Sequence, residues 1–240
     1  MLTLALDTTS EQGGMAIYRD SDCLALVANQ GPPNMYSITV FEMVHNLLWQ
    51  AKLQLRDVDL FTVACGPGSF TGIRVGIAAT QAWARALGRP VCGVSILEAV
   101  VEAALPAEEW AVPILDAHRG EFYIGRFRST SRHGEATGAA FESDGSGWVL
   151  KADSLAAFCE SHLPAGATVA CLAREHDHAS RAFQEILPNS YRFRIVAGPL
   201  LGAIARRGLE AHRRGRSQSP AELDACYIRR PDAELNWRDN

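Results

Sequence analysis

The glycine-rich segment at residues 66–76 constrains the fold of this chain more than any other part. It reads GPGSFTGIRVG, follows a β-type apolar run at 60–65 and opens a helical run at 73–87. A strand, a glycine turn and a helix start in this order leave free backbone N–H groups at the positive end of a helix dipole. Such a turn suits an anion or the acidic edge of a partner, and Ser69 or Thr71 is positioned to cap the helix.

Two familiar nucleotide-binding loops do not match this segment. A phosphate-binding P-loop ends in Gly-Lys-Ser/Thr, and no lysine occurs between positions 52 and 151. A dinucleotide fingerprint needs G-x-G-x-x-G and an acidic residue about 20 positions on. Here the third glycine is one residue late, and positions 60–97 hold no Asp or Glu. Arg85 or Arg89 could serve a phosphorylated ribose, so an NADP-dependent oxidoreductase stays an alternative.

The composition indicates a protein with a sizeable core and no strong charge. The chain has 240 residues, of which 48% are hydrophobic, and its net charge is −4. It can therefore form one or two domains, and no global basic field favours nucleic acid. No run approaches 18 apolar residues, and the start lacks the cationic region of a signal peptide. We expect a soluble, cytoplasmic protein without membrane contact.

The order of predicted elements is repeated along the chain. The first half is expected to hold strands at 2–7, 14–19, 23–28, 60–65 and 91–95, with helices at 36–54 and 73–87. The second half is expected to hold strands at 113–116, 122–126, 168–172 and 192–196, helices at 154–162, 174–187 and 199–213, and a loop at 129–147. Each half opens with a strand that ends in an aspartate, Asp7 or Asp116.

This duplication predicts an α/β protein with a two-lobed actin-like (ribonuclease-H-like) fold. Each lobe would be a mixed sheet with helices, in the order β-β-β-α-β-α. The expected boundaries are an N-terminal lobe at 1–105, a C-terminal lobe at 106–216 and a tail at 217–240. In a working ATPase of this fold, Asp7 and Asp116 would hold magnesium and phosphates. We favour the simpler interpretation that each aspartate caps its own hairpin turn.

The two helices of the first half carry a pattern that favours a subunit interface. Residues at four-residue spacing leave one face of the second helix nearly smooth: Gly72, Gly76, Thr80, Ala84 and Gly88. An interior glycine costs about 1 kcal/mol relative to alanine, so a close neighbour would explain Gly76. The first helix is apolar on most sides and needs a second partner besides the sheet. A Gly76→Trp variant is then expected to fold and no longer pair; burial between the chain's own elements is the alternative.

Several stretches in family order resemble the bacterial TsaB (YeaZ) family over nearly the full length. They are LDTT at 6–9, the whole glycine loop, GVSILEA at 93–99, DAHRGEFY at 116–123 and YIR at 227–229. Three features depart from the family pattern. Tyr36 stands where the family usually has His, Ala225 stands where a proline is usual, and the arginine-rich segment at 206–216 has no family counterpart.

The resemblance implies a subunit that is not an enzyme by itself. Such proteins pair with the TsaD-type catalytic subunit through the two helices of the first lobe, and form homodimers when alone. With a TsaE-type ATPase, the assembly transfers threonylcarbamoyl to the adenosine beside the tRNA anticodon. The complex uses ATP and magnesium, whereas this chain needs no cofactor and meets tRNA only through the complex.

The candidate site residues follow from this resemblance. The partner-binding residues would be Tyr36, Thr39, Val40, Met43, Leu47, Ser69, Phe70, Gly72, Ile73, Gly76 and Thr80. A remnant nucleotide site would comprise Asp7, Thr8, Thr9 and Asp116. No catalytic residue and no metal site is expected, because no two of the seven histidines stand at i, i+4 spacing.

Two further interpretations stay open at this point. A small actin-like ATPase or kinase could act alone through Asp7 and Asp116, whereas peptidase activity has neither metal ligands nor a nucleophile elbow to support it. The arginines at 206–216 could contact tRNA, but the cationic end of a helix explains them more simply.

Overall fold

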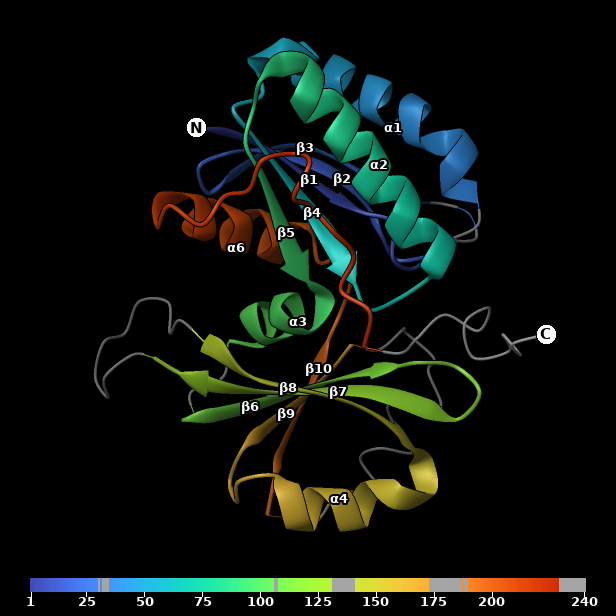
Figure 1. Ribbon diagram of the computed structural model, residues 1–240, viewed down its shortest axis with the longest axis vertical. Helices are drawn as coiled ribbons and strands as arrows, with labels where there is room; N and C mark the ends of the chain where they lie inside the picture. The colour runs from blue at the N-terminus through green and yellow to red at the C-terminus, as the bar shows by residue number, and fades with distance from the viewer. Residues whose placement is uncertain are drawn as a thin grey trace, which may run out of the picture. The chain divides into compact units, whose positions relative to one another are not determined.

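In the computed structural model, the structure describes residues 1–29, 31, 35–105, 108–130, 141–172, 187 and 190–228. The chain divides into two units, which are Met1–Ile96 with Pro199–Asn240, and Leu97–Gly198 (Figure 1). Each unit contains one five-stranded sheet and its own hydrophobic core. Within the described residues, no helix combines the length and the apolar character needed to cross a bilayer.

The sheet of the first unit has the order β3-β2-β1-β4-β5. Its strands are β1 (Leu2–Asp7), β2 (Gly14–Arg19), β3 (Asp22–Ala28), β4 (Leu60–Gly66) and β5 (Val91–Ser95). The first three strands form an antiparallel meander, and β4 and β5 add in parallel. Parallel pairing needs crossover connections, and two helices supply them. The carboxyl ends of β1 and β4 therefore meet at one edge.

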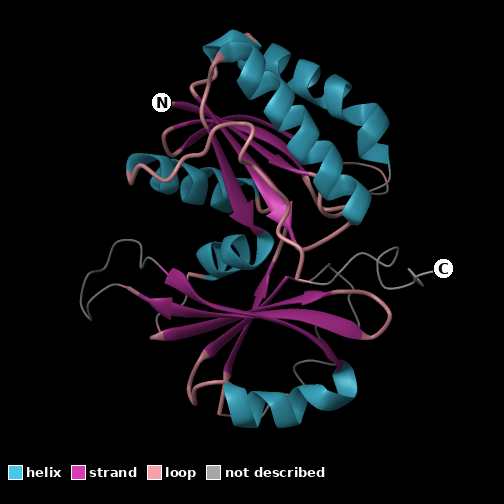
Figure 2. Ribbon diagram, viewed as in Figure 1, coloured by secondary structure: helices cyan, strands magenta, loops and turns pink. Residues whose placement is uncertain are grey.

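Helices cover both faces of this sheet (Figures 1 and 2). Helices α1 (Tyr36–Ala51) and α2 (Phe70–Leu87) lie on one face, and α6 (Leu201–Arg213) lies on the other. A short 3₁₀ helix, η2 (Leu55–Asp57), follows α1. The core between the sheet and the first two helices contains Leu4, Leu6, Met15, Ile17, Phe61, Val63, Val40, Met43, Leu47, Ile73 and Ile77.

Helix α6 belongs to the first unit, although the expected C-terminal lobe at 106–216 included it. Its Leu209 packs with Leu60 of β4 and Cys92 of β5. Gly208 explains how α6 comes so close, because a Cβ there would lie 2.1 Å from Cγ2 of Thr62. Sequence order alone does not reveal which sheet a terminal amphipathic helix covers, and that is why the expected boundary differs.

The sheet of the second unit has the order β10-β9-β6-β7-β8. Its elements are α3 (Ile96–Ala104), β6 (Trp110–Asp116), β7 (Glu121–Ser129), β8 (Phe141–Lys151), η3 (Ala152–Ser154), α4 (Leu155–His162), β9 (Thr168–Leu172) and β10 (Arg192–Val196). Leu155 and Phe158 of α4 pack on Ile114 and Ile124 to form its core. Leu97 of α3 lies beside Gly125 of β7.

The two sheets repeat one topology, so the predicted duplicated α/β fold of the actin-like type is confirmed. Strands β8-β7-β6-β9-β10 follow the same order and directions as β3-β2-β1-β4-β5. Two sequence-based expectations need correction. Residues 141–147, expected in a loop, belong to β8, whose two glycines mask its strand pattern, and α3 was not expected. The helix expected at 174–187 lies outside the described residues except for position 187.

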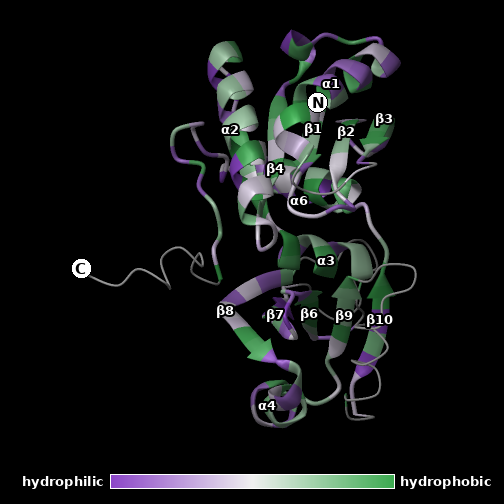
Figure 3. Cartoon of the chain, turned by 90° about the vertical axis from the view of Figure 1, so that its right-hand side faces the viewer, coloured by the Kyte–Doolittle hydropathy of each residue, from purple (hydrophilic) through white to green (hydrophobic). Residues whose placement is uncertain are grey.

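Local sequence signals set the ends of α2. The hydroxyl of Ser69 accepts a 3.2 Å hydrogen bond from the N–H of Gly72, so Ser69 is the N-cap, as one of the two expected candidates. Gly88 ends the helix in a left-handed conformation at φ 62°, which glycine adopts without steric cost. Figure 3 shows mostly pale or green colour along α2, as expected for a helix with few charges.

Candidate functional site

The glycine loop packs against the turn that follows β1. The N–H of Ser69 donates to the carbonyl oxygen of Thr9 at 2.7 Å, and the hydroxyl of Thr8 donates to the carbonyl oxygen of Gly72 at 2.7 Å. The N–H of Ile73 donates to the carbonyl oxygen of Ser69 at 2.9 Å. The glycine loop was expected to offer free backbone N–H groups to an anion. The N–H groups of Ser69, Gly72 and Ile73 already have acceptors within the chain.

The small-residue face of α2 is buried inside the first unit, which corrects the expectation that a partner helix covers it. A Cβ at Gly72 would lie 1.9 Å from the carbonyl oxygen of Thr8, and one at Gly76 would lie 2.3 Å from the Thr8 hydroxyl. Thr80 and Ala84 are also buried. The close neighbour of the two glycines is the chain's own β1 turn. A Gly76→Trp variant should consequently fail to fold normally rather than yield an intact monomer.

Asp7 is buried and its carboxylate is engaged by the next turn. Its Oδ1 accepts hydrogen bonds from the N–H of Thr9 at 2.8 Å and from the Thr9 hydroxyl at 2.7 Å. Burial raises the pKa of this carboxyl, and the Thr9 bonds oppose the shift. In the second unit, Asp116 is exposed and its Oδ1 accepts from the N–H of His118 at 2.7 Å. Each aspartate accepts a hydrogen bond from the backbone N–H two residues later in the chain, which is the Asx-turn pattern. This pattern supports the interpretation that each aspartate caps its own turn.

Tyr36 is a core residue at the start of α1. Its side chain is fully buried, and its hydroxyl donates to the carbonyl oxygen of Ser10 at 2.9 Å. Gly13 makes room for this hydroxyl, because a Cβ there would lie 2.5 Å from it. Burial and the nearby Asp7 carboxylate raise the pKa of Tyr36. The tyrosine therefore ties α1 to the loop after β1.

Most of the expected partner-binding residues lie in the core of the first unit and cannot be touched by a partner in this conformation. The buried residues are Tyr36, Val40, Met43, Leu47, Gly72, Ile73, Gly76 and Thr80. Three others are half-buried: Thr39, Ser69 and Phe70. A helix that is apolar on most sides does not reveal in its sequence which apolar side faces the sheet, and the expected residues therefore fall on the buried side.

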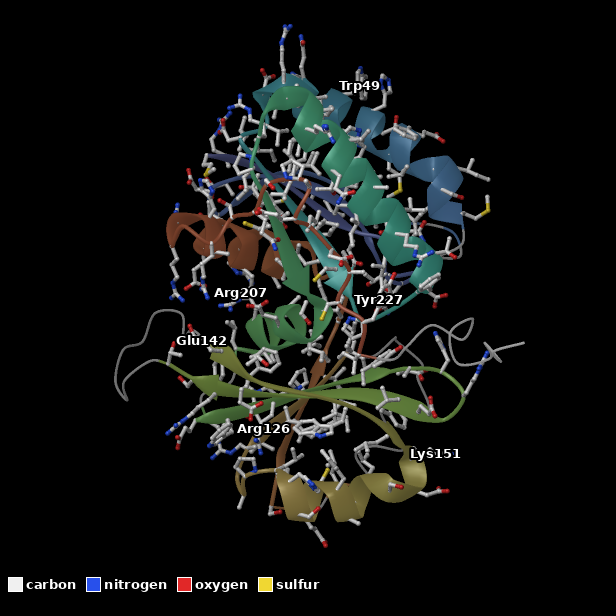
Figure 4. All side chains as sticks on the ribbon, viewed as in Figure 1. Trp49, Arg126, Glu142, Lys151, Arg207 and Tyr227 are labelled. Carbon is white, nitrogen blue, oxygen red and sulfur yellow. The ribbon has the colours of Figure 1, made fainter. Side chains whose placement is uncertain are left out.

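The exposed side of α1 carries large apolar residues that the candidate list did not include. Ile38 is 70% exposed, Phe41 is 63% exposed and Trp49 is 77% exposed. Ile38, Phe41, His45 and Trp49 are all exposed and follow one another at intervals of three or four residues. Side chains at this spacing lie along one side of a helix. Figure 4 shows the Trp49 side chain at the outer end of α1. Large exposed apolar side chains on one side of a helix are typical of interaction surfaces.

Helix α2 extends this surface with small side chains. Phe41 meets Trp83 of α2 edge-on, with ring centroids 6.4 Å apart, so the two helices are neighbours. The exposed row along α2 consists of Thr71, Arg74, Ala78, Ala82 and Arg85. We call the exposed side chains Ile38, Phe41, Trp49, Arg74, Ala78 and Ala82 the α1–α2 face. The signal that could have found this face is the second apolar stripe of α1.

The end of the described chain runs back over the first unit. Gln218 exchanges two backbone hydrogen bonds with Val91 of β5, and Leu223 is buried beside Gly93. The N–H of Cys226 donates to the carbonyl oxygen of Cys65 at 2.7 Å. Figure 4 labels Tyr227 near the end of this path. The tail at 217–228 is therefore an integral part of the first unit.

The arginine-rich segment forms ion pairs within the chain. Arg207, labelled in Figure 4, is 8% exposed and contacts the Glu210 carboxylate at 2.9 Å. Arg214 contacts the same carboxylate at 2.5 Å. Arg213 contacts Asp20 at 3.2 Å. These pairs favour the structural interpretation of the segment. Over the part of the chain that the structure describes, no group of three or more His, Cys, Asp or Glu side chains could hold a metal ion.

Sequence comparisons show which known proteins the chain resembles. The family model for TsaD, described as tRNA N6-adenosine threonylcarbamoyltransferase, matches residues 35–175, more than half of the chain. The tRNA threonylcarbamoyladenosine biosynthesis protein TsaB of Bacillus subtilis is 32% identical over 128 residues, 53% of this chain and 56% of that protein. An uncharacterized protein of Mycobacterium bovis is 31% identical over 188 residues, 78% of this chain and 72% of that protein.

A solved structure of YeaZ from Pseudomonas aeruginosa has the same fold. It aligns with a TM-score of 0.70 and 24% identity, covering 95% of this chain and 99% of that chain. Among the curated relatives, the chain spans only 56% to 64% of the length of the first three that it matches.

Proposed function

Because the chain belongs to the TsaB/YeaZ family, we propose that it is a non-catalytic subunit that docks onto a TsaD-type catalytic subunit. In this role it supports threonylcarbamoyl transfer onto the adenosine beside the tRNA anticodon. The observation that carries the proposal is the α1–α2 face, with Ile38, Phe41 and Trp49 held in solvent. Burying three such side chains contributes about 1.5–3 kcal/mol each, a large part of a stable association.

The composition of the face supports an interface of ordinary size. A stable interface buries about 1,600 Å² in total, and aromatic anchors near its centre dominate the binding energy. On α1 the aromatic side chains project outward, whereas Ala78 and Ala82 of α2 leave room for a partner's side chains. The same face would serve a homodimer when the catalytic subunit is absent, so the two assemblies would compete.

The proposal assigns the chemistry to the assembled complex. The catalytic subunit would supply the transfer site, and ATP with magnesium would be used by the complex with a TsaE-type ATPase. This chain would need no cofactor, would meet tRNA only through the complex and would work in the cytoplasm. A stand-alone ATPase acting through Asp7 gains no support, because its carboxylate is buried and already accepts two hydrogen bonds from Thr9.

Size-exclusion chromatography with light scattering tests this proposal. The chain is run alone and then mixed with the TsaD-type subunit from the same source. We expect a homodimer that gives way to a 1:1 heterodimer when the catalytic subunit is added. A chain whose mass is unchanged by the catalytic subunit would contradict the proposed function.

A further inference from the structure

The guanidinium of Arg74 on the α1–α2 face contacts two aromatic side chains. Its carbon Cζ lies 3.8 Å from the centroid of the Phe70 ring, one helical turn earlier on α2. Its Nε donates a 3.3 Å hydrogen bond to the hydroxyl of Tyr227, and the Tyr227 ring lies 5.5 Å from the Phe70 ring. Three side chains from α2 and the tail thus hold one another in a single cluster.

The outer end of this guanidinium, which carries the two terminal nitrogens, has no acceptor among the residues that the structure describes. Arg74 is exposed, and within the described residues its two terminal nitrogens have no hydrogen-bond or ion-pair partner. Arginines elsewhere on the first unit, such as Arg207 and Arg213, are paired with carboxylates. The two terminal nitrogens of a planar guanidinium can donate in parallel to the two oxygens of one carboxylate.

We infer that Arg74 is a preorganised receptor for a carboxylate side chain of the docking subunit, and that Tyr227 positions it. This inference rests on the proposed function and adds the chemistry of the partner's surface. Binding has to order a free arginine side chain, at a cost in side-chain entropy, and the stack on Phe70 with the bond to Tyr227 removes part of this cost before binding.

A carboxylate is favoured over a nucleic-acid phosphate by the position of Arg74. It lies in the same exposed row of α2 as Ala78 and Ala82, which continues the apolar side chains of α1. A charged group at the margin of an apolar face is the arrangement typical of protein–protein interfaces. The tail consequently controls affinity through Arg74 without needing to touch the partner itself.

The test measures the dissociation constant for the TsaD-type subunit, without tRNA, by titration calorimetry. We expect Arg74→Gln to weaken binding about tenfold to a hundredfold, the effect of losing hydrogen bonds to a charged group. Arg74→Lys keeps the charge without the planar guanidinium and should restore only part of the affinity. Tyr227→Phe keeps the ring but frees the guanidinium, and should weaken binding about threefold.

The matched control is Arg19→Gln, an exposed arginine at the opposite end of the sheet from Asp7 and the glycine loop. It removes the same charge and should leave binding unchanged, and all variants should keep the wild-type melting temperature. Raising the salt concentration should weaken wild-type binding more than Arg74→Gln binding, since the ion pair is screened.

Four results separate the possible failures. If the wild-type chain does not bind the catalytic subunit, the proposed function is wrong and this inference falls with it. If the wild type binds and Arg74→Gln behaves like Arg19→Gln, only the inference is overturned. An unchanged subunit affinity with weaker tRNA binding by the assembled complex would show that a phosphate is the ligand, and would also overturn it. Wild-type affinity in Tyr227→Phe would overturn the positioning role of the tyrosine.

Discussion

The hydroxyl of Thr8 donates a 2.7 Å hydrogen bond to the carbonyl oxygen of Gly72, and so joins the end of β1 to the first turn of α2. The bond is buried, and Gly72 and Gly76 allow the close approach that it needs. The glycine loop therefore acts within the chain, where it sets the position of α2 on the sheet. Through α2 it also positions the side chains Arg74, Ala78 and Ala82 of the α1–α2 face.

Gly76→Ala should destabilise the protein by about 1–3 kcal/mol, because a Cβ there would lie 2.3 Å from the Thr8 hydroxyl oxygen and would displace that hydroxyl from its bond to Gly72. This loss would exceed the helix-propensity gain of about 1 kcal/mol. Urea unfolding measures the change. In a Thr8→Ala background the obstruction is gone, so adding Gly76→Ala should cost much less. Equal costs in both backgrounds would contradict this account.

The stability of the folded chain should depend on pH through Asp7. In the unfolded chain its carboxyl titrates near the ordinary pKa of 3.8, and burial raises that pKa in the folded protein. Between the two pKa values the folded state binds more protons, so this contribution is fully present below 3.8 and is lost as the pH rises.

Asp7→Asn, which keeps an oxygen acceptor for Thr9, should remove this pH dependence. The measurement compares the free energy of unfolding of wild type and variant at several pH values from about 4.5 to 7.5. Relative to wild type, the variant should gain stability as the pH increases. A difference that stays constant over this range would show that Asp7 does not titrate as its burial implies.

Arg207→Ala should destabilise the first unit by about 1–3 kcal/mol, because it removes a buried stem and leaves the Glu210 carboxylate without this contact. The matched variant is Arg213→Ala, whose side chain is 63% exposed where it pairs with Asp20. An exposed pair contributes at most about 1 kcal/mol. Chemical denaturation of both variants distinguishes them, and equal losses would argue against a structural role for Arg207.

The tail should contribute directly to stability through Leu223, which is 4% exposed. Leu223→Ala removes a buried side chain from the core of the first unit and should cost about 2–5 kcal/mol. Leu24→Ala, at a half-exposed site on β3, serves as the control and should cost much less. A Leu223 variant as stable as the Leu24 variant would mean that the tail is only loosely attached.

Most of the fold could be predicted from the sequence, because the alternation of hydrophobic residues and the positions of turn residues indicate the same strand ends. The strands β1, β2, β5, β9 and β10 begin and end at the expected residues. Strand β8 was missed in part because Gly145 and Gly147 interrupt its pattern, and α3 was missed because it directly follows β5 without a turn signal. These errors arise where local pattern and tertiary structure disagree.

The site was harder to predict than the fold, for a physical reason. The two apolar stripes of α1 look alike in sequence, and only the packed sheet shows that Tyr36 and Leu47 face inward while Trp49 faces solvent. The small residues of α2 correctly indicated that another part of a protein packs closely against the helix. They do not distinguish a turn of the same chain from the helix of a partner, because either can fill the space beside a glycine. The role of Tyr227 depends on a tertiary contact with Phe70 and Arg74, which no local pattern encodes.

The most direct test of the central claim compares Ile38→Glu with Ile195→Glu in binding to the TsaD-type subunit. Ile195 is a matched control, because it is 59% exposed but belongs to β10 of the second unit. Both variants should fold, since neither side chain is buried. We predict that Ile38→Glu weakens the heterodimer at least about tenfold, because it leaves a charge in a desolvated apolar interface, whereas Ile195→Glu binds like wild type. Equal affinities of the two variants would contradict docking through the α1–α2 face.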